Sequence, residues 1–227
     1  MMNFGGIVQA ITVWAVPILL AVTLHEAAHG YAALLLGDDT ARRMGRLSLN
    51  PIRHVDPFGT VILPAILLVL GGVIFGWAKP VPVNFGKLKG RRLGMVGVAL
   101  AGPGMNMVLA IIGAWGMVMM PAMPDYGREW LLLNLQHLFF INILLAVFNM
   151  LPVPPLDGGR VVVGLLPRPL AMRWARLENV GLLLIMGALF LLPLVGQALH
   201  INLNVFGWLV SGPVEWLMGV VARMVGM

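Results

Sequence analysis

The chain alternates between long apolar runs and shorter polar loops. Six apolar runs stand out: Ile7–Leu36, Phe58–Trp77, Leu93–Met120, Leu131–Leu151, Asn179–Val195 and Val205–Val221. A helix needs about 20 apolar residues to cross a bilayer, and several runs reach that length. The pattern therefore predicts an all-α membrane protein, a polytopic helical bundle of about five to six transmembrane segments with a re-entrant or membrane-associated β-like element. No polar block is long enough for a soluble domain, so we expect residues 1–227 to form a single integral-membrane domain.

Composition supports this class. Of the 227 residues, 59% are hydrophobic and 11% are charged, whereas soluble domains average about 45–50% and about 25%. A water-soluble globule is thereby excluded. Cysteine is absent, which excludes disulfides, thiolate nucleophiles and cysteine-ligated metal sites. In a membrane protein, the net charge of +6 indicates cytoplasmic loops beside anionic headgroups, and it does not favour nucleic acid as a partner.

The positions of the cations predict the topology. Two loops, one on each side of the second apolar run, carry most of them: Arg42, Arg43, Arg46 and Arg53, then Lys79, Lys87, Lys89, Arg91 and Arg92. Both loops should be cytoplasmic, so the segment Phe58–Trp77 between them is expected to be a re-entrant or broken element rather than a simple span. We therefore expect a multi-pass cell-membrane protein with an outside N-terminus, five spans and one re-entrant segment. A true crossing by Phe58–Trp77 stays open.

The candidate chemistry begins in the first run, where residues 25–29 read His-Glu-Ala-Ala-His. Positions i and i+4 share a helix face, so His25 and His29 can converge on one metal ion while Glu26 reaches a reacting water. Counted back from Leu36 at about 1.5 Å per residue, this motif lies roughly 10 to 15 Å below the cytoplasmic end. Ionisable groups at that depth are costly and normally functional. Polar contacts between packed helices would explain one such histidine more readily than this trio.

A catalytic zinc site usually takes three protein ligands, so a third must come from elsewhere. Asp157 is the best candidate, because the prolines of residues 152–155 end the fourth helix and present it from irregular backbone at the same cytoplasmic end. An ordinary interfacial turn capped by an aspartate is the alternative. The remaining histidines are His54, His137 and His200. His54 could be a loop residue or could face the mouth of the site, whereas the other two suggest packing or interface positions.

Together these motifs resemble the site-2 protease family of intramembrane zinc metalloproteases, in its compact form without a PDZ domain. The resemblance rests on residues 25–29, on the Ala-Gly-Pro-Gly-Met-Asn sequence of residues 101–106, and on Asn149 followed by Leu-Asp-Gly-Gly at residues 156–159. Asn106 could be an interhelical contact, and the resemblance suggests that it supports a metal ligand.

The resemblance implies the following site residues: a single zinc ion held by His25, His29 and Asp157, Glu26 as the catalytic base, and Asn149 as a residue that positions or polarises the substrate. The implied partners are the lipid bilayer and transmembrane protein substrates, whose helices would be cleaved at a site that opens toward the cytoplasm. Neither an oligomeric state nor a particular substrate follows.

A proline-rich stretch, residues 76–84, could hold an unwound substrate. Pro80 and Pro82 lack amide hydrogens, while Val81 and Val83 could pair with an added substrate strand. A stiff connector at the membrane surface explains the stretch equally well, and both interpretations stay open.

Two other functions compete with proteolysis. The first is a membrane ion or metal carrier that binds its cargo through intramembrane histidine and carboxylate groups, which inverted repeats would favour. No such repeat is visible in the sequence. The second is a catalytically inactive binding homologue, and the intact Glu26 argues against it.

Overall fold

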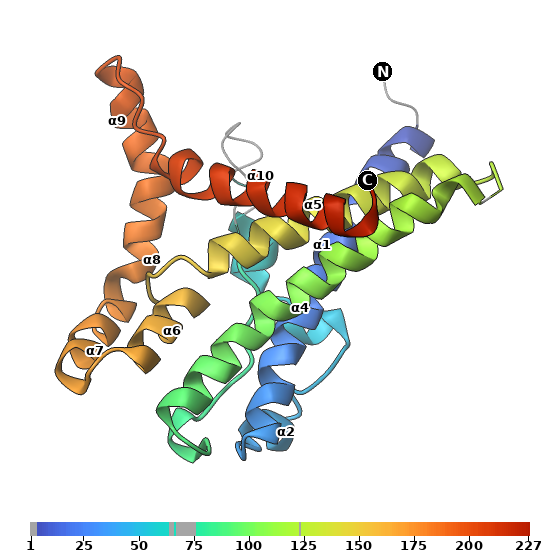
Figure 1. The fold of residues 1–227 in the computed structure, drawn as a ribbon. Helices are drawn as coiled ribbons and strands as arrows, with labels where there is room; N and C mark the ends of the chain where they lie inside the picture. Colours follow the sequence, from blue (N-terminus) through green and yellow to red (C-terminus); the bar gives the residue numbers. More distant parts are fainter. Residues whose placement is uncertain (1–3, 64–65, 67–75, 123) are drawn as a thin grey trace.

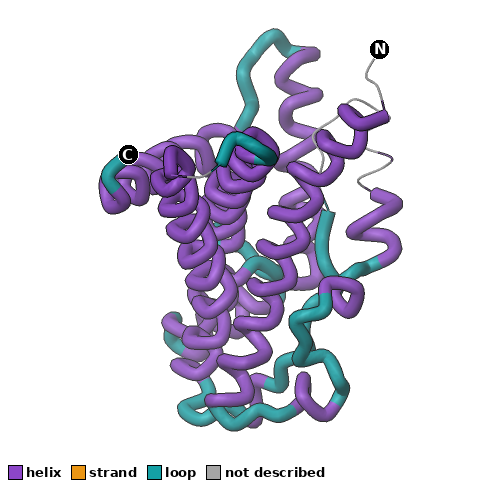
Figure 2. The backbone as a smooth tube through the Cα atoms, turned by 90° about the vertical axis from the view of Figure 1, so that its right-hand side faces the viewer, coloured by secondary structure: helices purple, strands orange, loops and turns teal. Residues whose placement is uncertain are grey.

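A computed structural model describes residues 4–63, 66, 76–122 and 124–227. The described backbone consists of helices and loops (Figure 2). The expectation of an all-α protein is therefore confirmed. The expected β-like element is not found, because no strand occurs in the part of the chain that the structure describes. The proline-rich stretch of residues 76–84, which could pair with a substrate strand or act as a stiff connector, runs as loop.

Figure 1 shows the order and arrangement of the elements. In chain order they are α1 (Phe4–Leu35), α2 (Thr40–Arg43), η1 (Pro51–His54), η2 (Pro57–Ile62), η3 (Phe85–Lys87), α4 (Arg92–Met119), η4 (Met120–Ala122), α5 (Arg128–Asn149), α6 (Asp157–Leu165), α7 (Arg168–Ala175), α8 (Glu178–Met186), η5 (Gly187–Leu191), α9 (Leu192–Ala198) and α10 (Val205–Val225).

Four helical stretches are long and apolar enough to cross a membrane: Ile11–Leu35, Arg92–Ala122, Arg128–Asn149 and Glu178–Ala198. They correspond to four of the predicted spans. The last predicted run forms α10, a helix of 21 residues. The total of five to six crossings stays a prediction.

Gly37 terminates the first helix. Gly37 has a φ of +100°, which a residue with a side chain rarely adopts. The Gly37 amide donates to the Leu34 carbonyl at 3.0 Å and the Asp38 amide to the Ala33 carbonyl at 2.8 Å. This paired pattern is the Schellman motif, which satisfies the last carbonyls of a helix. It fixes the direction in which the chain leaves α1.

Helix α4 lies at the centre of the bundle, where it contacts α1, α5, α6 and α10. A Cβ at Gly113 would lie 3.0 Å from the Phe139 amide nitrogen, so α4 and α5 approach as closely as glycine allows. The buried core joins α4 and α5 to α10: Ala110, Ala114, Phe139, Ile143, Val147, Val210, Val214 and Val221. Figure 1 shows α8 and α9 as a separate column beside this bundle.

After α1 the chain leaves the bundle and returns to the same end of that helix. The Lys89 amide donates to the Leu36 carbonyl at 2.7 Å, so the two cationic loops that flank this excursion belong to one end of the molecule. The expected re-entrant segment Phe58–Trp77 lies largely outside the described residues. Its ends, however, meet: the Trp77 amide donates to the Gly59 carbonyl at 3.1 Å, and the Thr60 hydroxyl to the Trp77 carbonyl at 2.8 Å.

Asp38 fastens the returning chain to the end of α1. Its side chain is 1% exposed and accepts hydrogen bonds from the Thr40 amide at 3.0 Å, the Thr40 hydroxyl at 2.5 Å and the Asn84 amide at 2.6 Å. Burial alone would raise the pKa of Asp38. The hydrogen bonds and the nearby charge of Lys87 outweigh it and hold this pKa below its usual value.

We expect Asp38→Asn to lower the free energy of unfolding at neutral pH by about 1.5–3 kcal/mol, because a neutral amide accepts these hydrogen bonds more weakly. Since the folded-state pKa of Asp38 is depressed, its stabilisation is present above the unfolded pKa of about 3.9 and is lost as the pH falls through the folded value. The two proteins should therefore converge in stability below about pH 4.

Unfolding in detergent micelles, followed over this pH range, measures the difference. Asp39→Asn is the control, because Asp39 forms an exposed pair with Arg43 and such pairs stabilise little. Equal stabilities of the two variants at neutral pH would contradict the anchoring role of Asp38.

Candidate metal centre

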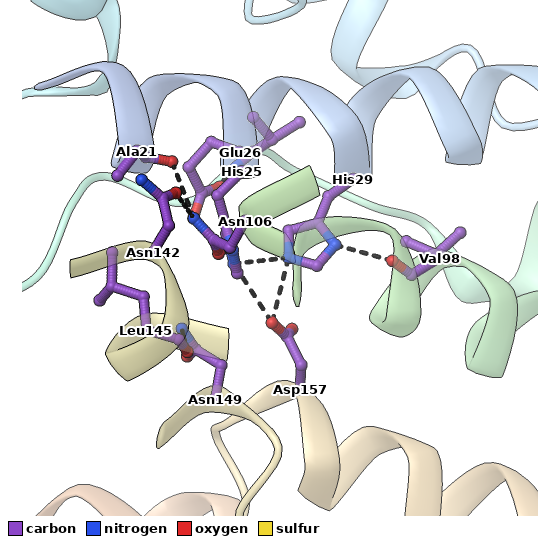
Figure 3. Close-up of polar contacts among 11 residues, drawn as sticks. Ala21, His25, Glu26, His29, Val98, Asn106, Asn142, Leu145, Asn149 and Asp157 are labelled. Carbon is purple, nitrogen blue, oxygen red and sulfur yellow. Dashed lines mark hydrogen bonds and ion pairs between the residues drawn. The ribbon is translucent and has the colours of Figure 1, made fainter. Parts of the chain in front are cut away.

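Three buried side chains converge on one point (Figure 3). The Nε2 atoms of His25 and His29 lie 3.0 Å apart, and each lies 3.2 Å from Oδ2 of Asp157. These residues are 7%, 6% and 5% exposed. The histidines come from one face of α1, one turn apart, and the aspartate is the first residue of α6. The structure thus brings together the three residues that the sequence suggested as ligands.

Hydrogen bonds to the other ring nitrogens determine which atoms face this point. His25 Nδ1 lies 2.6 Å from Oδ1 of Asn106, and His29 Nδ1 lies 2.7 Å from the Val98 carbonyl oxygen. Both partners are acceptors. The Val98 carbonyl oxygen can only accept, and the Asn106 side chain turns its oxygen to His25 because its Nδ2 atom donates to Asn142. Each Nδ1 therefore carries the hydrogen, and each Nε2 presents a lone pair to Asp157.

These atoms fit a metal ion. Oδ2 of Asp157 is buried without a hydrogen-bond donor, and two imidazole lone pairs face it. Three acceptors this close together repel one another unless a cation lies among them. In tetrahedral zinc sites, metal–ligand bonds of about 2.0 to 2.1 Å place ligand atoms about 3.3 Å apart, close to the spacings seen here. The residues present therefore fit zinc.

Helix α4 packs against both histidines at Gly102. A Cβ added at Gly102 would overlap the Nε2 atom of His29 and would lie 2.6 Å from Nε2 of His25. Only glycine leaves this volume free. The next residue, Pro103, lies inside α4 and has no amide hydrogen to donate to the Ala99 carbonyl one turn earlier. The Val98 carbonyl, in the turn that precedes Gly102, accepts from His29.

A tight bend presents Asp157. Cβ atoms at Gly158 and Gly159 would overlap backbone atoms of the bend, those of Met150 and Pro154 respectively. These two glycines therefore allow the bend to fold back against the start of α6. The carboxylate then stands at the positive end of the helix dipole, which favours its negative charge.

A chain of buried amides supports His25 from behind. Asn106 accepts from His25 and donates to Oδ1 of Asn142 at 2.7 Å, and Asn142 donates to the Leu138 carbonyl at 2.8 Å. Both asparagines are fully buried. Asn142 is a functional residue that the sequence motifs did not indicate. Its signal was an amide in the middle of an apolar run, where polar side chains are costly unless paired.

Glu26 makes a contact that the sequence did not predict. Its Oε2 atom accepts a hydrogen bond of 2.7 Å from the backbone amide of Val81, in the loop that runs beside α1. Val81, one of the two residues expected to pair with a substrate strand, thus already donates its amide hydrogen within the protein. The loop lies so close to α1 that the Glu26 carboxylate takes the hydrogen bond that a substrate strand would otherwise accept.

Other predicted residues lie outside the metal cluster. Asn149 donates from Nδ2 to the Leu145 carbonyl of its own helix at 3.0 Å, near Asp157 in Figure 3 but without a hydrogen bond to it. His54 is 2% exposed in η1, and its Nε2 atom lies 2.8 Å from the Ser48 carbonyl oxygen. A cavity of about 650 Å³ lies at the corner between α9 and α10 and includes His200.

We expect Gly102→Ala to weaken zinc binding by about 10- to 100-fold or more, because the added methyl displaces both imidazoles, and indirect changes around a metal already cost that much. The measurement is zinc content after equilibration against buffered zinc. Gly104→Ala on the same helix is the matched control, because its Cβ would meet nothing within 4 Å. Equal zinc content in the two variants would show that the close packing at Gly102 does not affect the metal ligands.

Comparison with known proteins places the chain in a family. Residues 116–194, which include Asp157 but not the histidine pair, match peptidase family M50. The chain is 42% identical over 196 residues to "Putative zinc metalloprotease YwhC" of Bacillus subtilis, a match covering 83% of this chain and 84% of that protein.

Two further relatives are named "Putative zinc metalloprotease Rip2". The one from Mycolicibacterium smegmatis is 31% identical over 62% of this chain and 52% of its own length. The one from Mycobacterium tuberculosis is 32% identical over 68% of this chain and 56% of its own length. No solved structure matches. On the extent of the YwhC match and the family match, the chain belongs to peptidase family M50, the site-2 protease family.

Proposed function

We propose that this protein is an intramembrane zinc metalloprotease that hydrolyses peptide bonds within or near the transmembrane helices of other membrane proteins. One observation carries the proposal: His25, His29 and Asp157 direct three acceptor atoms at a common point, with Glu26 one residue along the same helix. Membership of the M50 family supports it.

The residues divide the work between binding and proton transfer. His25, His29 and Asp157 would hold one zinc ion, which when bound polarises a carbonyl group and lowers the pKa of water. Glu26 would accept a proton from the attacking water and return it to the leaving amine. Asn106 fixes the orientation of the His25 ring throughout, because its amide is itself held by Asn142.

We propose that water and substrate reach the site from the cytoplasmic end. All three ligands are at most 7% exposed, and they lie near the end of α1 where the cationic loops gather. Polar backbone at membrane depth is tolerated only along surfaces lined by protein. A substrate helix would therefore unwind locally at this end before its peptide bond reaches Glu26. We propose that Asn149, at the end of α5, contacts the unwound stretch.

We expect Glu26→Gln to reduce cleavage about 10²- to 10⁴-fold, the usual contribution of general acid–base catalysis, while zinc content stays unchanged. Purified protein in liposomes is incubated with a panel of labelled peptides, each with one apolar span of about 20 residues, and products are identified by mass. Asp157→Ala should lose both zinc and cleavage, while Asp125→Ala, at an exposed loop position, should lose neither. Unimpaired cleavage by Glu26→Gln would remove Glu26 as the base.

The proposed orientation has a separate test. The chain contains no cysteine, so single cysteines can be introduced at Arg42 and Lys89 without background labelling. Both positions should react with a membrane-impermeant thiol reagent only from the cytoplasmic side, while a cysteine at Asp125 should react only from outside. Labelling of positions 42 and 89 from opposite sides would reverse the proposed course of the intervening chain.

A further inference from the structure

The loop that carries Val81 is fixed to the protein at several points. The Lys79 amide donates to the His54 carbonyl at 2.8 Å, and Arg46 donates from Nη2 to the Lys79 carbonyl at 2.9 Å. At the other end, the Asn84 amide donates to Asp38 at 2.6 Å. Residues 79–84, which we call the strap, therefore have both ends anchored to the region around the end of α1.

The middle of the strap lies directly against α1. Val81 is 7% exposed, and its Cγ1 atom is 3.1 Å from the position that a Cβ at Gly30 would occupy. Gly30 directly follows the second histidine of the metal cluster. The missing side chain at Gly30 thus lets the strap approach the face of α1 that carries Glu26, while the anchors at its two ends hold its backbone in place.

The sequence of the strap leaves a single donor at this place. Pro80 and Pro82 have no amide hydrogen, so Val81 supplies the only backbone N–H among residues 80–82. That hydrogen is donated to Oε2 of Glu26 at 2.7 Å. A donor between two prolines cannot be replaced by its neighbours if the chain slips by one residue, which makes the pairing specific.

We propose that the Val81 amide is a positioning group for the catalytic base: it holds Oε2 of Glu26 so that the other carboxylate oxygen is oriented for proton transfer. This inference rests on the proposed function. A free glutamate side chain samples several rotamers, and a charge-assisted hydrogen bond from a fixed backbone donor restricts them. Val81 then acts through Glu26 and touches neither metal nor substrate.

The contact itself can be tested without any enzymatic activity. A peptic peptide covering residues 79–83 reports exchange chiefly at Val81 and Val83, because its first residue back-exchanges and two positions are prolines. Glu26→Ala should accelerate amide exchange at Val81 at least tenfold in the full-length protein in micelles. Exchange at Val83 should not change, since within the described residues its amide has no hydrogen-bond partner. Unchanged exchange at Val81 would overturn the inference, whatever the enzyme does.

The functional consequence is tested with a matched pair of variants. Val81→Pro removes the donor and Val81→Ala keeps it while shortening the same side chain. We expect Val81→Pro to lower kcat on the labelled membrane-spanning peptides by about 10- to 100-fold, with KM and zinc content unchanged. Val81→Ala should retain a kcat within a few-fold of the wild type. Equal kcat for the two variants would overturn the inference.

The two proposals fail in different ways. If the wild-type protein cleaves no peptide while Val81 exchange depends on Glu26, the proteolytic function is wrong and the contact stands as a structural one only, so the positioning role falls with it. If the wild type cleaves and Val81→Pro cleaves equally well, only the positioning role fails. Should Val81→Pro not fold, the exchange measurement on Glu26→Ala decides the matter.

Discussion

Three acceptor atoms within 3.2 Å of one another are the constraint on which the rest of the structure depends. In a buried site these three acceptors repel one another until a cation binds between them. Hydrogen bonds from neighbouring groups must therefore hold the ligand side chains in place against this repulsion. The hydrogen bonds from both Nδ1 atoms supply that support. They also explain why α4 passes so close to α1: its Val98 carbonyl and its Asn106 amide both reach the ring nitrogens, and Gly102 between them leaves room.

The sequence predicted the parts of the site that local geometry determines. The spacing of His25 and His29 places them on one face of any helix, and the prolines before Asp157 predict irregular backbone at that point. What the sequence could not show is how separate elements meet. The pairing of Asn106 with Asn142 depends on the packing of α4 against α5, and a buried amide in an apolar run gives no indication of its partner. The contact between Val81 and Glu26 could not be predicted either, because its donor is a backbone amide, which every residue except proline has.

A similar division holds for the fold. Apolar runs predict helices well, since each long run in the described part of the chain became a helix at nearly the expected position. Run length alone does not say which segments cross the bilayer. Segment Phe58–Trp77 is as long as a span, yet its two ends meet between Gly59 and Trp77, which only the tertiary contacts reveal. The cations on both sides of it predict two loops on the same side of the membrane, and this prediction agrees with ends that meet.

The strap links charged side chains near the end of α1 to the orientation of the Glu26 carboxylate. Its anchors, Asp38 and Arg46, are charged side chains in the chain that follows α1, whereas His25, Glu26 and His29 lie within that helix. Between the anchors, only the Val81 amide points a donor at Glu26. A displacement of either anchor would therefore move the donor relative to the carboxylate without touching His25, His29 or Asp157. The orientation of the base and the coordination of the metal are thus set by different parts of the chain, so one can change while the other is preserved.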